Sequence, residues 1–133
     1  MKNYFKNAIV CVDDDPMILQ VLSFQIEKHI NTSETLTEYF SDPEVALEHL
    51  DAIKAEGIPV ACAIIDYQMP KMTGAQLIRK MKELDNATGF IMLSGQANGV
   101  QIDSLIEEKL LCKFIAKPWN EKELFDAINE LLA

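Results

Sequence analysis

Short apolar runs alternate with amphipathic stretches along the whole chain. Four runs have the length of buried strands, over residues 8–12, 60–65, 89–93 and 112–116, and TLTEYF at 35–40 is predicted as a further strand. Apolar residues recur at helical spacing in the stretches that follow them, which lie at residues 16–30, 43 to near 57, 77–84, around 100–108 and about 120–132. The pattern therefore predicts five strand–helix units in series.

Two of the predicted helices have clear start signals. Asp15 precedes Pro16, and Asp42 precedes Pro43, so each pair resembles a capping residue followed by proline at the first helical position. The predicted core-facing residues of the first, fourth and fifth helices are Ile18, Val21, Leu22 and Ile26, then Ile102, Leu105 and Ile106, then Leu124, Ile128, Leu131 and Leu132.

Alternating strands and helices are typical of a doubly wound α/β domain, in which crossover helices cover both faces of a parallel sheet. A length of 133 residues fits a single domain, so residues 1–133 are predicted to form one. The alternation alone leaves the strand order open.

Composition and charge narrow the possible partners. The net charge of −9 argues against direct binding to nucleic acid or to an anionic membrane, both of which need a basic surface. No apolar run approaches the roughly 20 residues of a membrane span, and the first residues, MKNYFKN, lack a signal-peptide core. We therefore expect a cytoplasmic location.

The cysteines and histidines show no metal-ligand spacing. Cys11, Cys62 and Cys112 each lie in an apolar stretch, so they are interpreted as buried thiols. His29 and His49 lie within helices at unrelated positions and are expected to be surface or partly packed residues without a catalytic role.

Polar residues follow four of the predicted strands. The first strand ends in Asp13, Asp14 and Asp15, the third in Asp66, the fourth in Ser94 and the fifth in Lys117. Because ligands of open parallel sheets bind at the carboxyl ends of the strands, these side chains are expected to converge at one edge.

The converging residue types suit phosphoryl chemistry. Clustered carboxylates without nearby His or Cys favour a hard cation such as Mg²⁺, and an aspartate can attack phosphorus. A lysine and a hydroxyl can stabilise the phosphoryl oxygens. The alternative for Asp15, and for Asp13 and Asp14 taken without Asp66, is that they serve as helix caps and turn residues.

The motifs at these positions resemble those of the receiver domains of two-component response regulators, the CheY-like family. IVCVDDDPMILQVL resembles the opening acidic pair and helix, and IIDYQMPKMTG resembles the phosphoacceptor segment. IMLSG and FIAKPW resemble the segments that carry the switch hydroxyl and the lysine. The resemblance spans nearly the whole chain and implies the flavodoxin-like strand order 2-1-3-4-5.

The resemblance also implies roles for the matching residues. Asp66 would be the phosphoacceptor, and Asp14, Asp66 and the backbone carbonyl of Gln68 would hold Mg²⁺ or Mn²⁺, with Asp13 reaching the ion through water. Lys117 and Ser94 would bind the phosphoryl group, and the Lys117–Pro118 peptide would be cis.

Three further positions follow from the same resemblance. Phe114 would be the aromatic residue that changes rotamer on activation, with an ordinary core aromatic as the alternative. Gln68 and Gln96 would tune the rate at which the phosphoryl group is lost. The stretch before the fifth strand lacks the usual glycine, so a longer or irregular fourth helix is expected.

The implied function is a phosphorylation switch, not a conventional enzyme. The phosphoryl donor would be a sensor histidine kinase or a histidine phosphotransfer protein, and dimerisation through the face between the fourth and fifth helices is a further hypothesis. The chain would be a stand-alone regulator or the receiver of a longer one.

Two alternatives stay open. A haloacid-dehalogenase-type phosphatase would explain Asp13-Asp14-Asp15 but leave Asp66 without a role, and a receiver-like module could bind partners without being phosphorylated.

Overall fold

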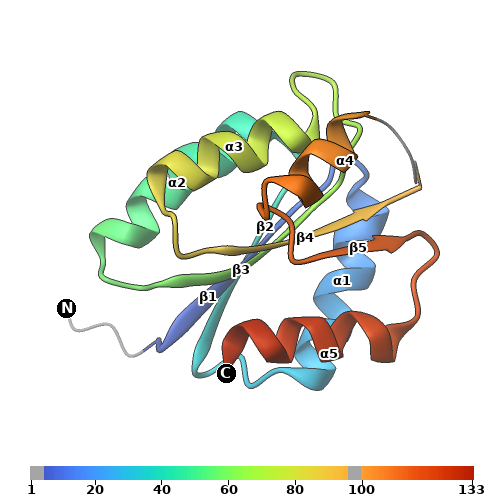
Figure 1. The fold of residues 1–133 in the computed structure, drawn as a ribbon. Coiled ribbons are helices and arrows are strands. Elements are labelled where there is room, and N and C mark those ends of the chain that lie inside the picture. The colour runs from blue at the N-terminus through green and yellow to red at the C-terminus, as the bar shows by residue number, and fades with distance from the viewer. Residues whose placement is uncertain (1–4, 96–99) are drawn as a thin grey trace.

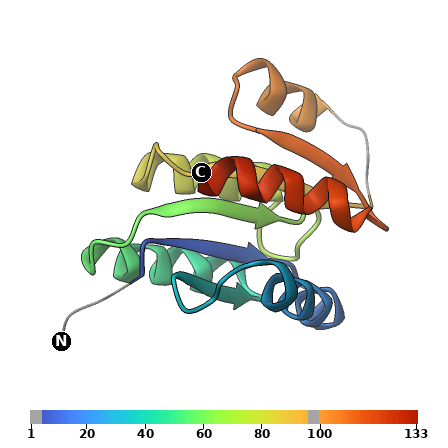
Figure 2. The same cartoon turned by 90° about the horizontal axis from the view of Figure 1, so that it is seen from below.

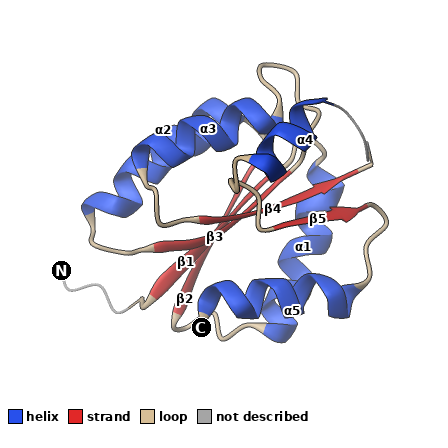
Figure 3. Ribbon diagram, in the orientation of Figure 1, coloured by secondary structure: helices blue, strands red, loops and turns tan. Residues whose placement is uncertain are grey.

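The computed structural model describes residues 5–95 and 100–133. Within them five strands alternate strictly with five helices (Figures 1 and 3). The strands are β1 (Asn7–Val12), β2 (Thr35–Phe40), β3 (Val60–Ile65), β4 (Gly89–Ser94) and β5 (Lys113–Ala116). The helices are α1 (Pro16–His29), α2 (Pro43–Ala55), α3 (Gly74–Leu84), α4 (Val100–Glu107) and α5 (Glu121–Leu132). The predicted series of strand–helix units is confirmed.

All five strands are parallel and lie in the order β2-β1-β3-β4-β5. This is the order that the family resemblance implied. The crossover from β1 leads to β2 on one side of it, and the crossover from β2 returns past β1 to β3 on the other side, so the switch point of the fold lies between β1 and β3.

The helices cover both faces of the sheet (Figures 1 and 2). Helices α2, α3 and α4 pack on one face, where Leu50, Ile78 and Leu105 belong to one buried cluster. Helices α1 and α5 pack on the other, where Ile26 and Ile128 belong to a second cluster. The three inner strands, β1, β3 and β4, are buried on both sides, and this explains why they are continuous apolar runs.

Two residues that were predicted to face the core do not. Val21 on α1 is 43% exposed and Ile106 on α4 is 54% exposed. Val21 precedes the buried Leu22, and Ile106 follows the buried Leu105. Neighbouring residues on an α-helix point about 100° apart, so only one of each pair faces the core. On each of these helices, fewer apolar residues are buried than the spacing of apolar residues predicted.

Helix α4 lies close to the predicted range of 100–108, and of the longer or irregular helix that was expected the structure shows an irregular ending. It ends at Glu107, and Lys109 adopts the left-handed conformation with φ 59°. The Leu110 N–H bonds the Leu105 carbonyl at 2.9 Å and the Lys109 N–H bonds the Ile106 carbonyl at 3.1 Å, which is a Schellman ending. Lysine thus takes the place of the usual glycine, at a conformational cost of about 1 kcal/mol.

The prediction of three buried cysteines was right for two of them. Cys11 and Cys62 are 0% exposed, and burial raises the pKa of both thiols. Cys112 is exposed, which corrects the prediction. It immediately precedes β5, the edge strand of the sheet, where the chain has a neighbouring strand on one side only.

Both histidines are exposed surface residues, as expected. The ring of His29 lies 4.4 Å from that of Phe125, and His29 also bonds Glu121 at the start of α5. The ring of His49 lies 5.0 Å from that of Phe40. No helix within the described residues is long and apolar enough to cross a membrane.

Candidate functional site

Three polar residues are held at the carboxyl edge of the sheet by their own backbone. The Asp13 N–H bonds the Phe40 carbonyl at 3.1 Å, the Asp66 N–H bonds the Val12 carbonyl at 3.0 Å, and the Lys117 N–H bonds the Ser94 carbonyl at 3.0 Å. Each bond continues the ladder one step past a strand. The side chains are therefore positioned by the sheet itself and not by a flexible loop.

These residues surround one open hollow of about 420 Å³ at the switch point. It is lined by Asp13, Asp14, Asp15, Asp66, Gln68, Ser94, Gly95 and Lys117. The predicted convergence of the four strand ends is confirmed. Gln96, which was expected nearby, lies outside the described residues.

Three carboxylates form the acidic part of the hollow. Oxygen atoms of Asp13, Asp14 and Asp66 lie within 4.8 Å of one another. Asp13 is 3% exposed and Asp66 is 7% exposed, whereas Asp14 is open to solvent. This all-oxygen set fits a small hard cation, because oxygen ligands with one solvent-accessible side let an ion such as Mg²⁺ retain part of its water shell.

Lys117 closes the other side of the hollow. Its Nζ donates to Asp13 Oδ2 at 2.7 Å and lies 3.4 Å from Asp66 Oδ1. Burial disfavours the ammonium, but the hydrogen bond and charge of Asp13, together with Asp66, outweigh it and raise the pKa of Lys117. The lysine therefore stays charged and neutralises part of the acidic cluster.

Neighbouring groups act in opposite directions on the pKa of the Asp66 carboxyl group. Burial and the charge of Asp13 raise its pKa above the ordinary value, and Lys117 offsets part of this effect. A buried carboxylate with a raised pKa is a site where additional positive charge is favourable. A cation in the hollow would supply that charge.

Asp15 has a structural role at the start of α1. Its side chain accepts a hydrogen bond from the Met17 N–H at 2.9 Å, and Pro16 occupies the first helical position. Its own N–H donates to Asp13 Oδ1 at 2.9 Å. The alternative interpretation of Asp15 as a helix cap is confirmed, and the cap also orients Asp13.

The loop after Asp66 is held tightly against the start of α3. A Cβ at Gly74 would lie 2.3 Å from the Asp66 carbonyl oxygen, so only glycine fits. The Gly74 N–H bonds the Tyr67 carbonyl at 2.6 Å. Sequence reasoning singled out Gly74 as part of a motif but missed Lys71, whose Nζ bonds Asp42 at 2.7 Å and ties the same loop to α2.

The remaining predicted residues lie on β4 and β5 and directly after β5. Ser94 is 1% exposed at the end of β4. Phe114 is half-buried on β5 and packs against the cluster under α2, α3 and α4. The Lys117–Pro118 peptide is cis, as predicted.

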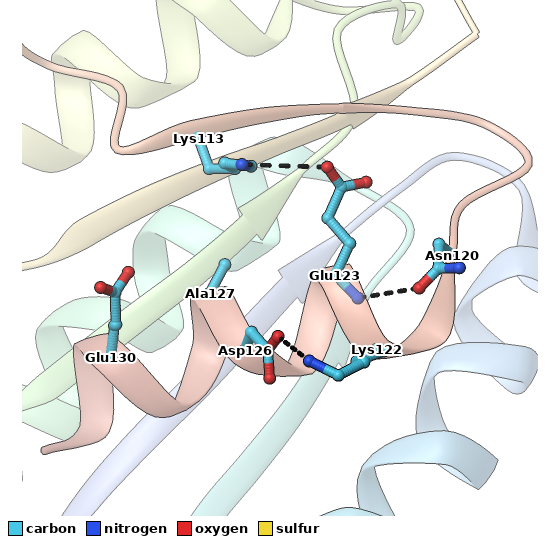
Figure 4. Close-up of a pocket in the computed structure, with 7 residues that line it drawn as sticks. All are labelled: Lys113, Asn120, Lys122, Glu123, Asp126, Ala127 and Glu130. Carbon is cyan, nitrogen blue, oxygen red and sulfur yellow. Dashed lines mark hydrogen bonds and ion pairs between the residues drawn. The ribbon is translucent and has the colours of Figure 1, made fainter.

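A second hollow, which sequence reasoning did not find, lies between β5 and α5 (Figure 4). It measures about 470 Å³, and charged side chains of both signs surround it. Lys113 on β5 lies 3.8 Å from Glu123, and Lys122 bonds Asp126 at 2.7 Å. The only sequence feature that marks this hollow is the mixture of acidic and basic residues on α5.

The sheet order 2-1-3-4-5, with carboxylates and a lysine at its carboxyl edge, is a flavodoxin-like α/β arrangement with a polar site at the strand ends. The family model described as response regulator receiver domain matches residues 9–129. The chain therefore belongs to the receiver-domain family of two-component response regulators. Domains of this signalling family are generally not enzymes.

Curated relatives agree with this assignment. The chain is 30% identical over 126 residues to the response regulator protein TodT of Pseudomonas putida, covering 95% of this chain and 51% of TodT. It is 32% identical over 126 residues to the heme response regulator HssR of Staphylococcus saprophyticus, covering 91% of this chain and 49% of HssR. The chain thus spans about half the length of these relatives.

Solved structures show the same fold. A signal receiver domain of an HD domain-containing protein from Pseudomonas fluorescens superposes with a TM-score of 0.80 at 24% identity, covering 96% of this chain and 94% of that one. CheY in the CheX–CheY–BeF3–Mg complex of Borrelia burgdorferi has a TM-score of 0.78 at 19% identity, covering 99% and 96%.

Proposed function

We propose that this receiver domain accepts a phosphoryl group on Asp66 from a phosphohistidine, with the aid of Mg²⁺ or Mn²⁺. The observation that carries the proposal is the grouping of the Asp13, Asp14 and Asp66 carboxylates beside the Lys117 ammonium. The Asp66 carboxylate thus lies beside the Lys117 ammonium and beside two carboxylates that could hold a cation. Both positive charges would offset the repulsion between the anionic phosphoryl group and the anionic carboxylate.

The proposed transfer is an in-line displacement at phosphorus. A carboxylate oxygen of Asp66 forms the new O–P bond while the P–N bond to the donor histidine breaks, and the released imidazole takes up a proton. The product is an acyl phosphate. Attack by water on its phosphorus releases inorganic phosphate and restores the carboxylate, which resets the domain.

The metal would be held by Asp14, Asp66 and the backbone carbonyl of Gln68, with Asp13 as a ligand through water. When bound, the cation neutralises charge on the phosphoryl oxygens. Asp14 and Gln68 line the hollow with Asp66, and the three carboxylates fit such an ion. This supports the ligand set.

Lys117 would bind a phosphoryl oxygen, and Ser94 would donate its hydroxyl to the same group. Both line the hollow. Movement of Ser94 would leave space for the Phe114 ring to change rotamer, which would alter the face formed by α4, β5 and α5. Gln68, and Gln96 if it lies nearby, would tune the loss of the phosphoryl group.

The donor would be a sensor histidine kinase or a histidine phosphotransfer protein, since response regulators work with histidine kinases and effectors. We propose that residues 1–133 form one receiver domain that controls an effector domain or partner protein. The support is that the chain matches about half of relatives such as TodT and HssR.

The proposal is tested by intact mass spectrometry of the wild-type chain after incubation with acetyl phosphate. We expect a gain of one phosphoryl group with Mg²⁺, none with EDTA, and loss of the gain in hydroxylamine, which cleaves acyl phosphates. If a folded chain gains no mass at saturating Mg²⁺, the alternative of an unphosphorylated interaction module replaces this proposal.

A homodimer through the α4–β5–α5 face is proposed as the readout. Ile106 on α4 is an apolar side chain that is 54% exposed. The β5–α5 hollow carries both acidic and basic side chains, so two copies related by twofold symmetry could pair opposite charges across this face. Sedimentation velocity over a concentration series should show a dimer strengthened by beryllofluoride and Mg²⁺, and weakened in Lys122→Glu. A monomer under all conditions would contradict this readout.

A further inference from the structure

The contacts of Trp119 connect the phosphoryl-binding lysine to helix α1. Trp119 follows Lys117 by two residues and is the only tryptophan of the chain. Its indole Nε1 donates to Gln25 Oε1 on α1 at 2.9 Å. Its ring is partly buried and packs against the core cluster under α1 and α5.

Lys117 needs an anchor that does not depend on the acidic cluster. Its ammonium is held by Asp13 at 2.7 Å and by Asp66 at 3.4 Å. These carboxylates are the groups that a cation and a phosphoryl group would engage, and their hold on the lysine would then weaken. The position of the lysine would depend on the backbone behind it.

The backbone behind Lys117 has few anchors of its own. The Lys117 N–H is bonded to the Ser94 carbonyl, but Pro118 has no N–H to donate. The next helix begins only after Asn120, whose side chain caps α5. The bond between Trp119 and Gln25 is a side-chain contact that joins this segment to α1.

We propose that Trp119 and Gln25 are positioning residues that hold Lys117 in place for phosphoryl transfer to Asp66. The inference rests on the proposed function of Asp66 and Lys117. It predicts that loss of the pair slows transfer to Asp66 without weakening metal binding, because Trp119 and Gln25 are not among the residues that would hold the metal, and a displaced Lys117 competes less for Asp13 and Asp66.

Gln25 can be changed without opening a cavity. It lines an open surface hollow with the exposed side chains of Met17 and Phe24. Gln25→Ala removes the acceptor, Trp119→Phe removes the indole N–H but keeps an aromatic ring, and Gln25→Glu keeps an acceptor oxygen. Glu121→Ala is the matched control, because Glu121 also ties α5 to α1 through Lys28 and His29 but lies beyond the Asn120 cap.

The experiment measures the rate of phosphorylation by acetyl phosphate at saturating Mg²⁺, the Mg²⁺ Kd by calorimetry, and the thermal midpoint. We expect Gln25→Ala and Trp119→Phe each to slow the reaction about fivefold, the effect of one neutral hydrogen bond. The double variant should be no slower than either single variant, since both remove the same bond. Gln25→Glu and Glu121→Ala should react at the wild-type rate, and no variant should bind Mg²⁺ more weakly than the wild type.

Wild-type rates in both single variants, or additive losses in the double variant, would overturn the inference. A parallel loss of rate, Mg²⁺ affinity and thermal midpoint would also overturn it, because it would mean a loss of folding stability only. A wild-type chain that takes up no phosphoryl group would instead overturn the proposed function, and this inference with it.

Discussion

Asp66→Asn is expected to abolish phosphorylation by acetyl phosphate under conditions where the wild-type chain gains one phosphoryl group. The amide of asparagine has nearly the same shape as the carboxylate but is not a nucleophile toward phosphorus. Asp66 is a buried carboxylate that lines the hollow, with the Lys117 ammonium 3.4 Å away. Intact mass spectrometry compares the two chains directly.

The Asp66→Asn chain should remain folded, so a missing mass gain can be assigned to chemistry. Burial and Asp13 raise the pKa of Asp66, so the folded state disfavours its charge and tolerates a neutral replacement. Asp51→Asn, the same change on an exposed position of α2, is the control and should be phosphorylated normally. A hydroxylamine-labile mass gain in Asp66→Asn would assign the phosphoryl group to another carboxylate.

Lys117→Ala is expected to slow phosphorylation about 100-fold, the usual loss when one preorganised charge stabiliser of a transition state is removed. The same variant should bind Mg²⁺ more tightly than the wild type. The reason is that Lys117 bonds Asp13 and lies beside Asp66, so its positive charge competes with a cation for the same oxygens.

These opposite effects separate a direct role of Lys117 from a general disturbance of the hollow. The rate is followed by intact mass over time, and the Mg²⁺ Kd by calorimetry. Lys122→Ala removes an equal charge from the exposed face of α5, where Lys122 pairs with Asp126, and should change neither quantity. If Lys117→Ala weakened Mg²⁺ binding, the proposed competition for Asp13 and Asp66 would be wrong.

Much of the fold was predictable because strands buried on both faces have a strong signal. The apolar runs located four strands and the TLTEYF segment the fifth, and the structure moves β1, β4 and β5 by a single residue at one end. Helix faces were less predictable. Val21, Ile106 and Cys112 are apolar but exposed, because burial depends on which neighbours a helix or an edge strand meets and not on the apolar pattern alone.

The sequence by itself determined which groups line the hollow. Asp13, Asp66, Ser94 and Lys117 each end or directly follow an apolar run, and the carboxyl ends of parallel strands must meet at one edge. Local sequence also determined the caps, such as Asp15 before Pro16, because a cap involves only neighbours along the chain.

Only the tertiary structure decided how those groups pair. It places the Lys117 ammonium closer to Asp13 than to Asp66, fits Gly74 against the Asp66 carbonyl, and joins Trp119 to Gln25. The bond between Lys117 and Asp13 spans 104 residues, and the bond between Trp119 and Gln25 spans 94. No periodicity encodes such contacts, because they depend on how the helices and strands pack around one another.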